Sequence, residues 1–346
     1  MASPDVTVRG AGIFGLSVAW ALVQRGARVR VIDPAGPGAG ASGGLVGALA
    51  PHVPEQWNAK KQFQLDSLLM AGRWWAEVAA AGGVDPGHAR LGRLQPLADA
   101  AAVRAAEARA AGAAALWQGR AVWQVVSATG AAWEPVSPAG LLVHDTLTAR
   151  LAPRRAVAAL VAALRARGAG IAPEGPDTGA VVWATGAAGL ADLSAALGRD
   201  VGGAVKGQAA LLAHDARDRP QLFAGGVHIV PHADGTVAVG STSETRWEAA
   251  AATDAALDDV IAAARAACPA LARAPVIERW AGLRPRARSR APMLGPWPGR
   301  PGHFVANGGF KIGFGMAPGV AQVMADLVLD GRDAIPAGFH VQDNLR

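Results

Sequence analysis

The chain of 346 residues has no tyrosine and a single cysteine, Cys268. One cysteine cannot close a disulfide within the chain, so the fold depends on its core, as is usual in a reducing compartment. The first residues do not contain a basic stretch followed by an apolar one, which is the pattern of a secretory signal. We therefore expect a cytoplasmic protein.

Charged residues are also few, at 17% of the chain, whereas hydrophobic residues make up 51%. This balance excludes a mainly disordered chain and predicts a large buried core. At roughly 150 residues per domain, the length corresponds to about two domains. Residues 35–54 carry no charge, but the many glycines and prolines among them exclude a helix that spans a membrane. We expect no membrane span.

Lysine is scarce as well, because only four of the 33 basic residues are lysines. The formal charge of +6 reflects compositional bias rather than a nucleic-acid surface, which needs basic residues gathered on one face. The one dense run is Arg284, Arg286, Arg288 and Arg290. The sequence has no Cys-x-x-Cys, His-x-x-x-His or Gly-x-Ser-x-Gly arrangement. We therefore expect no metal site and no nucleic-acid partner.

The first 33 residues have the order of a dinucleotide-binding unit. A β-branched strand over residues 6–9 precedes Gly10, Gly12 and Gly15, a helix is predicted over residues 16–24, and a strand over 29–32 ends at Asp33. These glycines permit a tight turn, close approach of a pyrophosphate and close packing of helix on strand. A carboxylate at the position of Asp33 binds an adenosine ribose and repels a 2′-phosphate. The pattern predicts a Rossmann-like site without separating NAD from FAD.

A loop of small residues follows, from position 34 to 52, far longer than a usual connection between strand and helix. Together with four later segments, it resembles the D-amino-acid oxidase and glycine oxidase superfamily of FAD enzymes. The later segments occur in the family's order and are Ala184-Thr185-Gly186, Ile229-Val230-Pro231, Trp280-Ala281-Gly282-Leu283-Arg284-Pro285 and Asn307-Gly308-Gly309-Phe310-Lys311.

The resemblance implies an α/β fold, α+β overall, in which a Rossmann-like FAD-binding domain is joined to a second, mostly antiparallel-sheet substrate domain. The FAD-binding domain is expected to be discontinuous, over residues 1–80, 140–205 and 275–346, and the substrate domain to comprise residues 81–139 and 206–274. We expect non-covalent FAD, because Cys268 lies outside every flavin motif. The residues expected to bind FAD are Gly10, Gly12, Ile13, Phe14, Gly15, Asp33, Pro34, Ala41, Ser42, Val46, Gly47, Ala48, Ala184, Thr185, Gly186, Gly309, Phe310, Lys311, Ile312, Gly313, Phe314 and Gly315.

Apolar periodicity predicts the remaining elements. Helices are expected over residues 60–81, 98–111, 154–167 and 254–267, and a hairpin is expected from strands 227–230 and 237–240. A last helix is expected after Pro318, with its positive N-terminus toward the flavin. Members of the family commonly carry a strand-rich excursion before the Ala-Thr-Gly strand, whereas only residues 171–180 are available here. The adenine contacts made from that excursion are therefore unassigned.

Four side chains are candidates for catalytic roles by resemblance. Arg284 matches the arginine that binds the substrate carboxylate through two parallel hydrogen bonds, with a salt bridge between domains as the alternative. His228 stands where glycine oxidase relatives present a tyrosine, and we expect it to titrate near neutrality unless it is an ordinary strand histidine. His52 lies at the end of the loop that resembles the family's flavin-contacting loop, and it is likewise either a catalytic residue or an ordinary structural histidine. Lys311 matches an arginine near the flavin, where a cation stabilises negative charge on the reduced ring. Lys206 is a weaker candidate at the domain crossing.

The function that the resemblance implies is FAD-dependent oxidation of a small amino acid or secondary amine, similar to glycine or sarcosine, to an imine that water hydrolyses. Dioxygen is the expected electron acceptor and yields hydrogen peroxide. Two alternatives stay open: a flavin dehydrogenase that passes electrons to a quinone or a carrier protein, and an FAD enzyme that modifies a wobble uridine of tRNA. The arginine run favours the tRNA enzyme, and the lack of an RNA-binding module disfavours it. A homo-oligomer is compatible with all of them.

Overall fold

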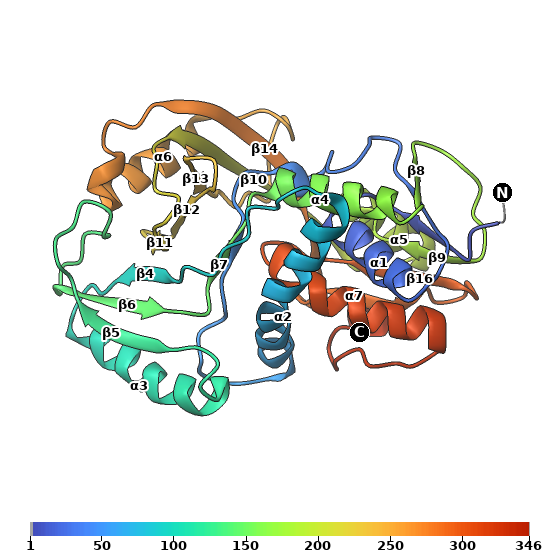
Figure 1. Cartoon of the computed structure of the whole chain (residues 1–346), viewed down its shortest axis with the longest axis horizontal. Helices are drawn as coiled ribbons and strands as arrows, with labels where there is room; N and C mark the ends of the chain where they lie inside the picture. The colour runs from blue at the N-terminus through green and yellow to red at the C-terminus, as the bar shows by residue number, and fades with distance from the viewer. Residues whose placement is uncertain (1–2, 346) are drawn as a thin grey trace.

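Two large β-sheets organise the chain in the computed structural model, which describes residues 3–345. They lie on opposite sides of the molecule in Figure 1, with helix α2 (Ala59–Gly82) between them. A small third sheet pairs β3 (Ala48–Leu49) with β7 (Ala149–Arg150). The predicted fold class, α/β with a second sheet-rich part, is confirmed.

The six-stranded sheet is the Rossmann-like part. Five of its strands are parallel, and β15 pairs antiparallel at one edge. The order is β15 (Met293–Pro296), β16 (His303–Asn307), β9 (Ala180–Trp183), β1 (Val6–Arg9), β2 (Val29–Ile32) and β8 (Gly170–Ala172). Because β1 lies between β2 and β9, the turn that follows β1 opens at the carboxyl edge of the sheet, where such folds bind nucleotides.

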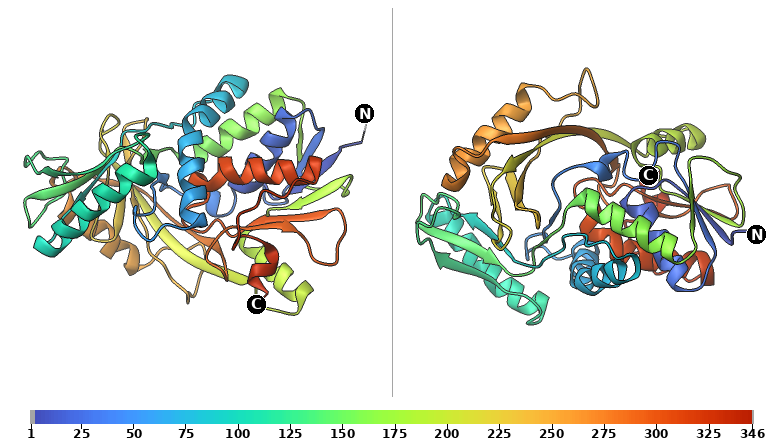
Figure 2. Two further views of the ribbon diagram at one scale, coloured as in Figure 1. Left: turned by 90° about the horizontal axis from the view of Figure 1, so that it is seen from below. Right: turned by 45° about the horizontal axis from the view of Figure 1, so that its top comes forward.

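Helices cover both faces of this sheet. One face carries α1 (Ile13–Gln24), α4 (Pro153–Ala166) and α7 (Gly313–Asp330), and α7 contacts both α1 and α2, as Figure 2 shows. The other face carries α5 (Gly186–Leu197). Neighbouring residues of β16 show the division, since Ala306 belongs to the core of α1 and α7 and Val305 to the core of α5.

The starts of two helices differ from the sequence prediction. Helix α1 begins at Ile13 rather than at residue 16, so the turn before it is shorter. Helix α7 begins at Gly313 rather than after Pro318, so the prediction of a helix start at that proline is wrong. A proline inside a helix removes a backbone hydrogen bond. Here the hydroxyl of Ser67 donates to the Gly315 carbonyl and accepts from the Gly319 N–H, which bridges the helix at this point.

The eight-stranded sheet is mostly antiparallel, and β4–β11 is its parallel pair within the described chain, residues 3–345. Helix α6 (Ala255–Ala267) packs on it through an apolar core, and α3 (Ala100–Trp117) packs on β5. The strand order is β14 (Val276–Ala287), β10 (Gly202–Ala213), β13 (Thr236–Gly240), β12 (Val227–Pro231), β11 (Gln221–Ala224), β4 (Arg93–Pro96), β6 (Leu141–Asp145) and β5 (Trp123–Ser127).

Most predicted elements agree with these bounds. The helices expected over 60–81, 154–167 and 254–267 match α2, α4 and α6 to within a residue at each end, and the expected hairpin is β12–β13. Helix α3 is longer than predicted and ends at Trp117. The predicted domain boundaries remain a prediction, but strands β6 and β14, which they assign to the FAD-binding part, pair in the eight-stranded sheet.

The shortened segment forms a plain connection. Strand β8 ends at Ala172, β9 begins at Ala180, and residues 173–179 contain no helix or strand. Arg9, the last residue of β1, donates to the Asp177 carboxylate at 2.7 Å and to the Gly175 carbonyl at 3.1 Å. These contacts hold the connection against the edge of the sheet. Within residues 3–345, no helix has the length and apolar character needed to cross a bilayer.

Candidate active site

The turn between β1 and α1 requires glycine for steric reasons. Gly10 has a φ of +103°, and a Cβ atom added there would lie 2.3 Å from the Ala184 carbonyl oxygen. A Cβ atom added at Gly15 would lie 1.9 Å from the Gly10 carbonyl oxygen. The first glycine therefore makes the turn and lets β9 approach, and the third lets α1 pack against the turn, as predicted.

The N-terminus of α1 is held by polar groups from two other segments. The Ser42 hydroxyl accepts a hydrogen bond from the Ile13 N–H at 2.9 Å, and the Asp33 carboxylate accepts from the N–H of Ala11 at 2.8 Å and of Ala35 at 3.0 Å. Asp33 therefore fixes the glycine turn, a role that the spacing alone does not indicate. Each carboxylate oxygen can accept a second hydrogen bond, so a ribose remains a fitting partner.

The other predicted cofactor segments contact this turn or the eight-stranded sheet. The Asn307 amide donates to the Gly186 carbonyl at 2.9 Å, and a Cβ atom added at Gly309 would lie 2.9 Å from Phe14 Cζ. Val46, in the loop over residues 34–52, lies against Gly240 of β13, since a Cβ atom added at Gly240 would be 2.8 Å from Val46 Cγ2. The crowded glycines and the polar groups around the first turn of α1 fit a long dinucleotide such as FAD.

Arg284 lies on β14 with only 8% of its surface exposed. It is paired in register with Val205, and its guanidinium lies over Gly207, where an added Cβ atom would be 1.6 Å from Nη2. Its Nη1 donates to the Thr242 carbonyl at 3.2 Å. Burial lowers the pKa of Arg284 to about 10, against the opposing effect of the Glu244 charge. The guanidinium therefore remains charged at neutral pH.

Lys311 lies close enough to both Arg284 and His228 for their charges to interact. Burial is the main cause that lowers the pKa of Lys311, and the charge of Arg284 adds to it. Burial also lowers the pKa of His228 to about 3, with smaller contributions from Arg93 and Lys311. The prediction that His228 titrates near neutrality is therefore wrong. Its ring packs on Phe223 at 4.6 Å, and its buried Nδ1 has no hydrogen-bond partner within residues 3–345.

The site is cationic and unneutralised. Across the described part of the chain, neither Arg284 nor Lys311 forms a salt bridge with a carboxylate. Lys311 lies over the ring of Phe310 at 5.7 Å, and Arg286 lies over the same ring at 5.8 Å. A buried cation such as Arg284 without an anionic partner is costly, and an anionic ligand would relieve that cost, whereas Lys311 is exposed beside it. This arrangement can bind a carboxylate.

His52 has a different environment from the other three candidates. Its ring Nδ1 and Gln64 Oε1 lie 2.5 Å apart, and its backbone N–H donates to the same oxygen at 2.7 Å. Burial lowers its pKa, and the charges of Lys60 and Lys61 add to this effect. Within residues 3–345, none of these contacts joins His52 to Arg284 or Lys311. A catalytic role for His52 stays a prediction.

Sequence reasoning missed a buried ion pair near the site. Arg93 of β4 donates to the Asp145 carboxylate of β6 at 2.9 Å, and both side chains are almost fully buried. The Arg93 guanidinium lies 6.0 Å from the ring of Phe223, on which His228 packs. Both residues lie outside the family motifs, and only strand register brings them together. Register between distant strands could not be read from the sequence.

The arginine run does not form one surface. Arg284 is buried, Arg286 packs on Phe310, and Arg288 and Arg290 lie on the exposed turn after β14.

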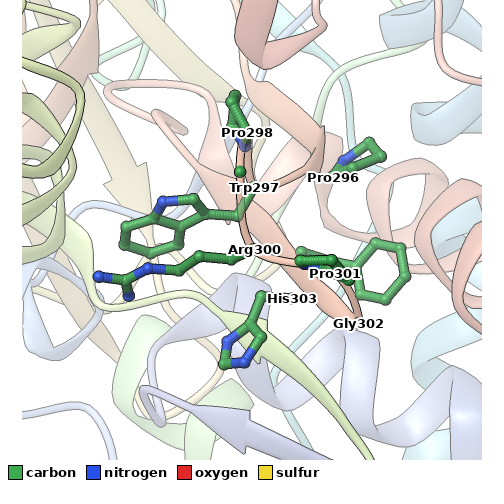
Figure 3. A pocket seen from close by; sticks show the side chains of 9 residues that line it. Pro296, Trp297, Pro298, Arg300, Pro301, Gly302 and His303 are labelled. Atoms are coloured by element: carbon green, nitrogen blue, oxygen red, sulfur yellow. The ribbon is translucent and has the colours of Figure 1, made fainter.

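A separate shallow hollow of about 520 Å³ lies at the turn between β15 and β16. In Figure 3, Arg300 lies beside the indole of Trp297, and His303 lies below. The Arg300 Cζ atom is 4.4 Å from the centroid of the Trp297 ring. Because this hollow contains none of the predicted site residues, we do not assign the chemistry to it.

Comparison with known proteins identifies the family. The family model described as FAD dependent oxidoreductase matches residues 5–327. The putative thiamine biosynthesis oxidoreductase ThiO of Rhizobium etli is 32% identical over 342 residues, which are 94% of this chain and 96% of that protein. The chain therefore belongs to the FAD dependent oxidoreductase family. It is an oxidoreductase whose cofactor is FAD, as the sequence predicted.

Two further similarities are narrower in what they show. The glycine oxidase of Pseudomonas aeruginosa is 35% identical over 132 residues, which span 38% of this chain but only 36% of that protein. The crystal structure of the glycine oxidase from Geobacillus kaustophilus superposes with a TM-score of 0.82 at 22% identity and covers 98% of both chains. The Pseudomonas similarity covers only about a third of that enzyme. The Geobacillus similarity supports the fold alone.

The low pKa of His228 makes a prediction about stability. Because its folded pKa of about 3 lies below its usual 6.5, the unfolded chain takes up this proton first as the pH falls. The stabilising contribution is complete above pH 6.5 and is lost as the pH falls toward 3. We expect His228→Gln to reduce the slope of the unfolding free energy against pH in this window by up to about 1.4 kcal/mol per pH unit.

Denaturant titrations from pH 7 to pH 4 measure this slope. The variant should keep part of the acid sensitivity, since burial also lowers the pKa of His88 to about 4. Identical slopes for the wild type and His228→Gln would show that the imidazole has the same pKa in the folded and unfolded states, which contradicts its lowering by burial.

Proposed function

We propose that this protein oxidises a small amino acid or secondary amine, of the glycine or sarcosine type, and passes the electrons to dioxygen. The observation that carries the proposal is the buried guanidinium of Arg284, which is charged and has no carboxylate partner within residues 3–345. Similarity to a glycine oxidase and to a putative ThiO protein supports the amine as donor. Together these favour a substrate that carries both a carboxylate and an amine.

Arg284 would bind the substrate carboxylate. One of its five N–H groups donates to the Thr242 carbonyl, which leaves the others for a pair of parallel hydrogen bonds to a carboxylate. Such a pair fixes the orientation of the substrate as well as its position. Gly207 makes room for the guanidinium, so this orientation depends on the backbone of β10.

Burial and positive charge set the protonation state of the substrate amine. An amine near Arg284 and Lys311 would lose its proton more readily, because a third positive charge is unfavourable there. Only a deprotonated amine has the lone pair that forms the C=N bond as a hydride leaves the neighbouring carbon. His228 is neutral above pH 4 and would act through a hydrogen bond of Nδ1 rather than as a proton donor.

Bound FAD supplies the two-electron acceptor for the C–H bond next to the amine. The Gly10–Gly15 turn, Ser42 and Asp33 would hold its dinucleotide part, and the segment from Gly309 to Gly315 would lie near its ring. Lys311 belongs to that segment and would stabilise negative charge that develops there. The exclusion of water by the buried site strengthens each of these interactions.

The test is anaerobic mixing of the oxidised holoenzyme with glycine, sarcosine, further N-alkyl glycines, and D- and L-amino acids. We expect at least one glycine-type amine to bleach the oxidised flavin spectrum and simple alkylamines without a carboxylate to react far more slowly. If no amine bleaches the flavin while dithionite does, the proposed donor class is wrong. If alkylamines react as fast as amino acids, the role of Arg284 is wrong.

The electron acceptor is tested separately. After reduction by the substrate, the enzyme is mixed with dioxygen, and we expect rapid reoxidation with one hydrogen peroxide formed per substrate consumed. Very slow reoxidation by dioxygen, with rapid reoxidation by a quinone, would identify the dehydrogenase alternative instead. The tRNA alternative has less support, because the arginine run is divided between the buried site and an exposed turn.

A further inference from the structure

A charged network lies on the opposite face of the sheet from the Arg284 guanidinium. Lys206 of β10 is 2% exposed, and its Nζ lies 3.5 Å from Glu244 Oε2 and 3.2 Å from Asp254 Oδ2. Gln208, two residues along the strand, donates from Nε2 to Glu244 at 3.0 Å and to Asp254 at 2.8 Å. A fully buried lysine costs free energy unless it is paired, so its position calls for an explanation.

Backbone pairing ties this network to the chain next to Arg284. The segment after β13 continues alongside β10, where the backbone groups of Lys206 and Glu244 exchange two hydrogen bonds of 2.9 Å. Since both residues form one antiparallel pair, their side chains lie on the same face of the sheet. Arg284 pairs with Val205 and lies over Gly207, on the other face.

Thr242 connects the two faces. Its hydroxyl accepts the Gln208 N–H at 2.8 Å and donates to the Glu244 carboxylate. In a regular antiparallel ladder the Gln208 N–H would donate to the Thr242 carbonyl, but here it donates to the Thr242 hydroxyl instead. The carbonyl is left to accept from Arg284 Nη1 at 3.2 Å. Lys206, Glu244, Thr242 and Arg284 therefore form one continuous chain of polar contacts.

Charge gives this chain a consequence for substrate binding. Glu244 is the carboxylate whose negative charge acts on Arg284, and it opposes the effect of burial on the Arg284 pKa. An unneutralised negative charge on the other face of the sheet would lower the positive potential at the guanidinium and so weaken its attraction for a substrate carboxylate. Lys206, Gln208 and the Thr242 hydroxyl together bind both oxygens of Glu244, and the positive charge of Lys206 offsets the negative charge of the carboxylate.

We propose that Lys206 is a positioning residue that neutralises and retains Glu244, so that Arg284 stays available to a carboxylate substrate. The inference rests on the proposed role of Arg284. In this proposal Lys206, in the Val205-Lys206-Gly207-Gln208 segment, increases the affinity for the substrate without contacting the flavin or the substrate. A purely structural lysine would affect stability but would not affect substrate affinity through Glu244.

The experiment is a pair of variants tested on the holoenzyme. Lys206→Met should weaken binding of acetate, a carboxylate that cannot be oxidised, by about tenfold, the scale of one uncompensated charge near a buried cation. Acetate binding is read from the perturbation of the flavin absorption spectrum. The KM of the best amine substrate should rise by a similar factor while kcat changes less than twofold. The double variant Lys206→Met/Glu244→Gln should recover acetate binding to within about threefold of the wild type.

Two single variants provide the controls. Asp254→Asn alters the exposed partner of Lys206 and should change acetate binding less than twofold. Glu244→Gln replaces the carboxylate by a neutral amide of the same shape and should bind acetate as well as the wild type or better. It also keeps the proposal testable if Lys206→Met does not fold, since a tenfold loss in Glu244→Gln would contradict the argument that the Glu244 charge opposes carboxylate binding.

The outcomes separate this inference from the proposed function. If acetate binds equally to the wild type and to Arg284→Ala, the proposed role of Arg284 fails and the inference fails with it. If Arg284→Ala loses acetate binding but Lys206→Met does not, the inference alone is wrong. Failure of Glu244→Gln to rescue Lys206→Met also overturns it, because the loss then arises from a distorted strand and not from Glu244.

Discussion

Replacing Arg284 by alanine should raise the KM for an amino-acid substrate by about 10² to 10³, with a smaller change in kcat at saturation. The side chain is buried beside a second cation, and its charge has no salt-bridge partner within residues 3–345. Truncating one partner of a buried, hydrogen-bonded charge pair costs about 2–5 kcal/mol of binding, or roughly 30- to 5,000-fold, and the expected factor lies in the middle of this range. Steady-state kinetics with the best substrate from the amine panel measure it.

The matched control is Arg279→Ala on the same strand. Arg279 is exposed and pairs with Asp258 at 2.8 Å, so its loss should leave KM within about twofold. Arg284→Lys keeps the charge but lacks the planar pair of donors, and should recover only part of the affinity. Equal KM values for the wild type and Arg284→Ala would contradict a carboxylate-binding role for this residue.

Gly207→Ala tests the same site without changing a charge. An added Cβ atom would lie 1.6 Å from Arg284 Nη2, so the guanidinium must move, and KM should rise at least about tenfold. Gly203→Ala on the same strand is the control, since the space around it is open. An unchanged KM in Gly207→Ala would show that Arg284 works from another position.

The sequence predicts the local parts of this fold well, because they depend on neighbouring residues. Glycine spacing, β-branched strands and apolar periodicity give the β1 turn, α2, α4, α6 and the β12–β13 hairpin. The start of α7 is predicted too late because proline is favoured near helix starts. Pro318 is accommodated inside the helix by hydrogen bonds to the Ser67 hydroxyl, which belongs to α2 and is not indicated by the local sequence.

The candidate site is predicted only in part for the same physical reason. The family resemblance indicates Arg284, His228 and Lys311, and the structure places Lys311 close enough to each of the other two for their charges to interact. The lowered pKa of His228 follows from burial beneath other strands, which a single segment does not reveal. The Lys206 network and the Arg93–Asp145 pair depend on register between strands far apart in the chain.

Loss of the Arg93–Asp145 ion pair should have the largest effect on stability. Asp145 is fully buried, accepts from Arg93 Nε at 2.9 Å and also accepts the Thr148 N–H at 2.8 Å. Asp145→Asn keeps the shape of the side chain but leaves the Arg93 charge buried and unpaired. Breaking a buried pair from one side costs about 3–5 kcal/mol, and we expect a loss of that size in the free energy of unfolding from denaturant titration.

Two variants show whether the uncompensated charge is the cause. Arg93→Met/Asp145→Leu removes both charges and should recover most of the loss, since buried ion pairs can be replaced by apolar residues of similar volume. Glu77→Gln breaks an exposed pair with Arg73 on helix α2 and should cost a small fraction of it. If Asp145→Asn is as stable as the wild type, water must reach Arg93. The guanidinium would then be solvated, and Arg93 could no longer contribute to lowering the pKa of His228 from a buried position.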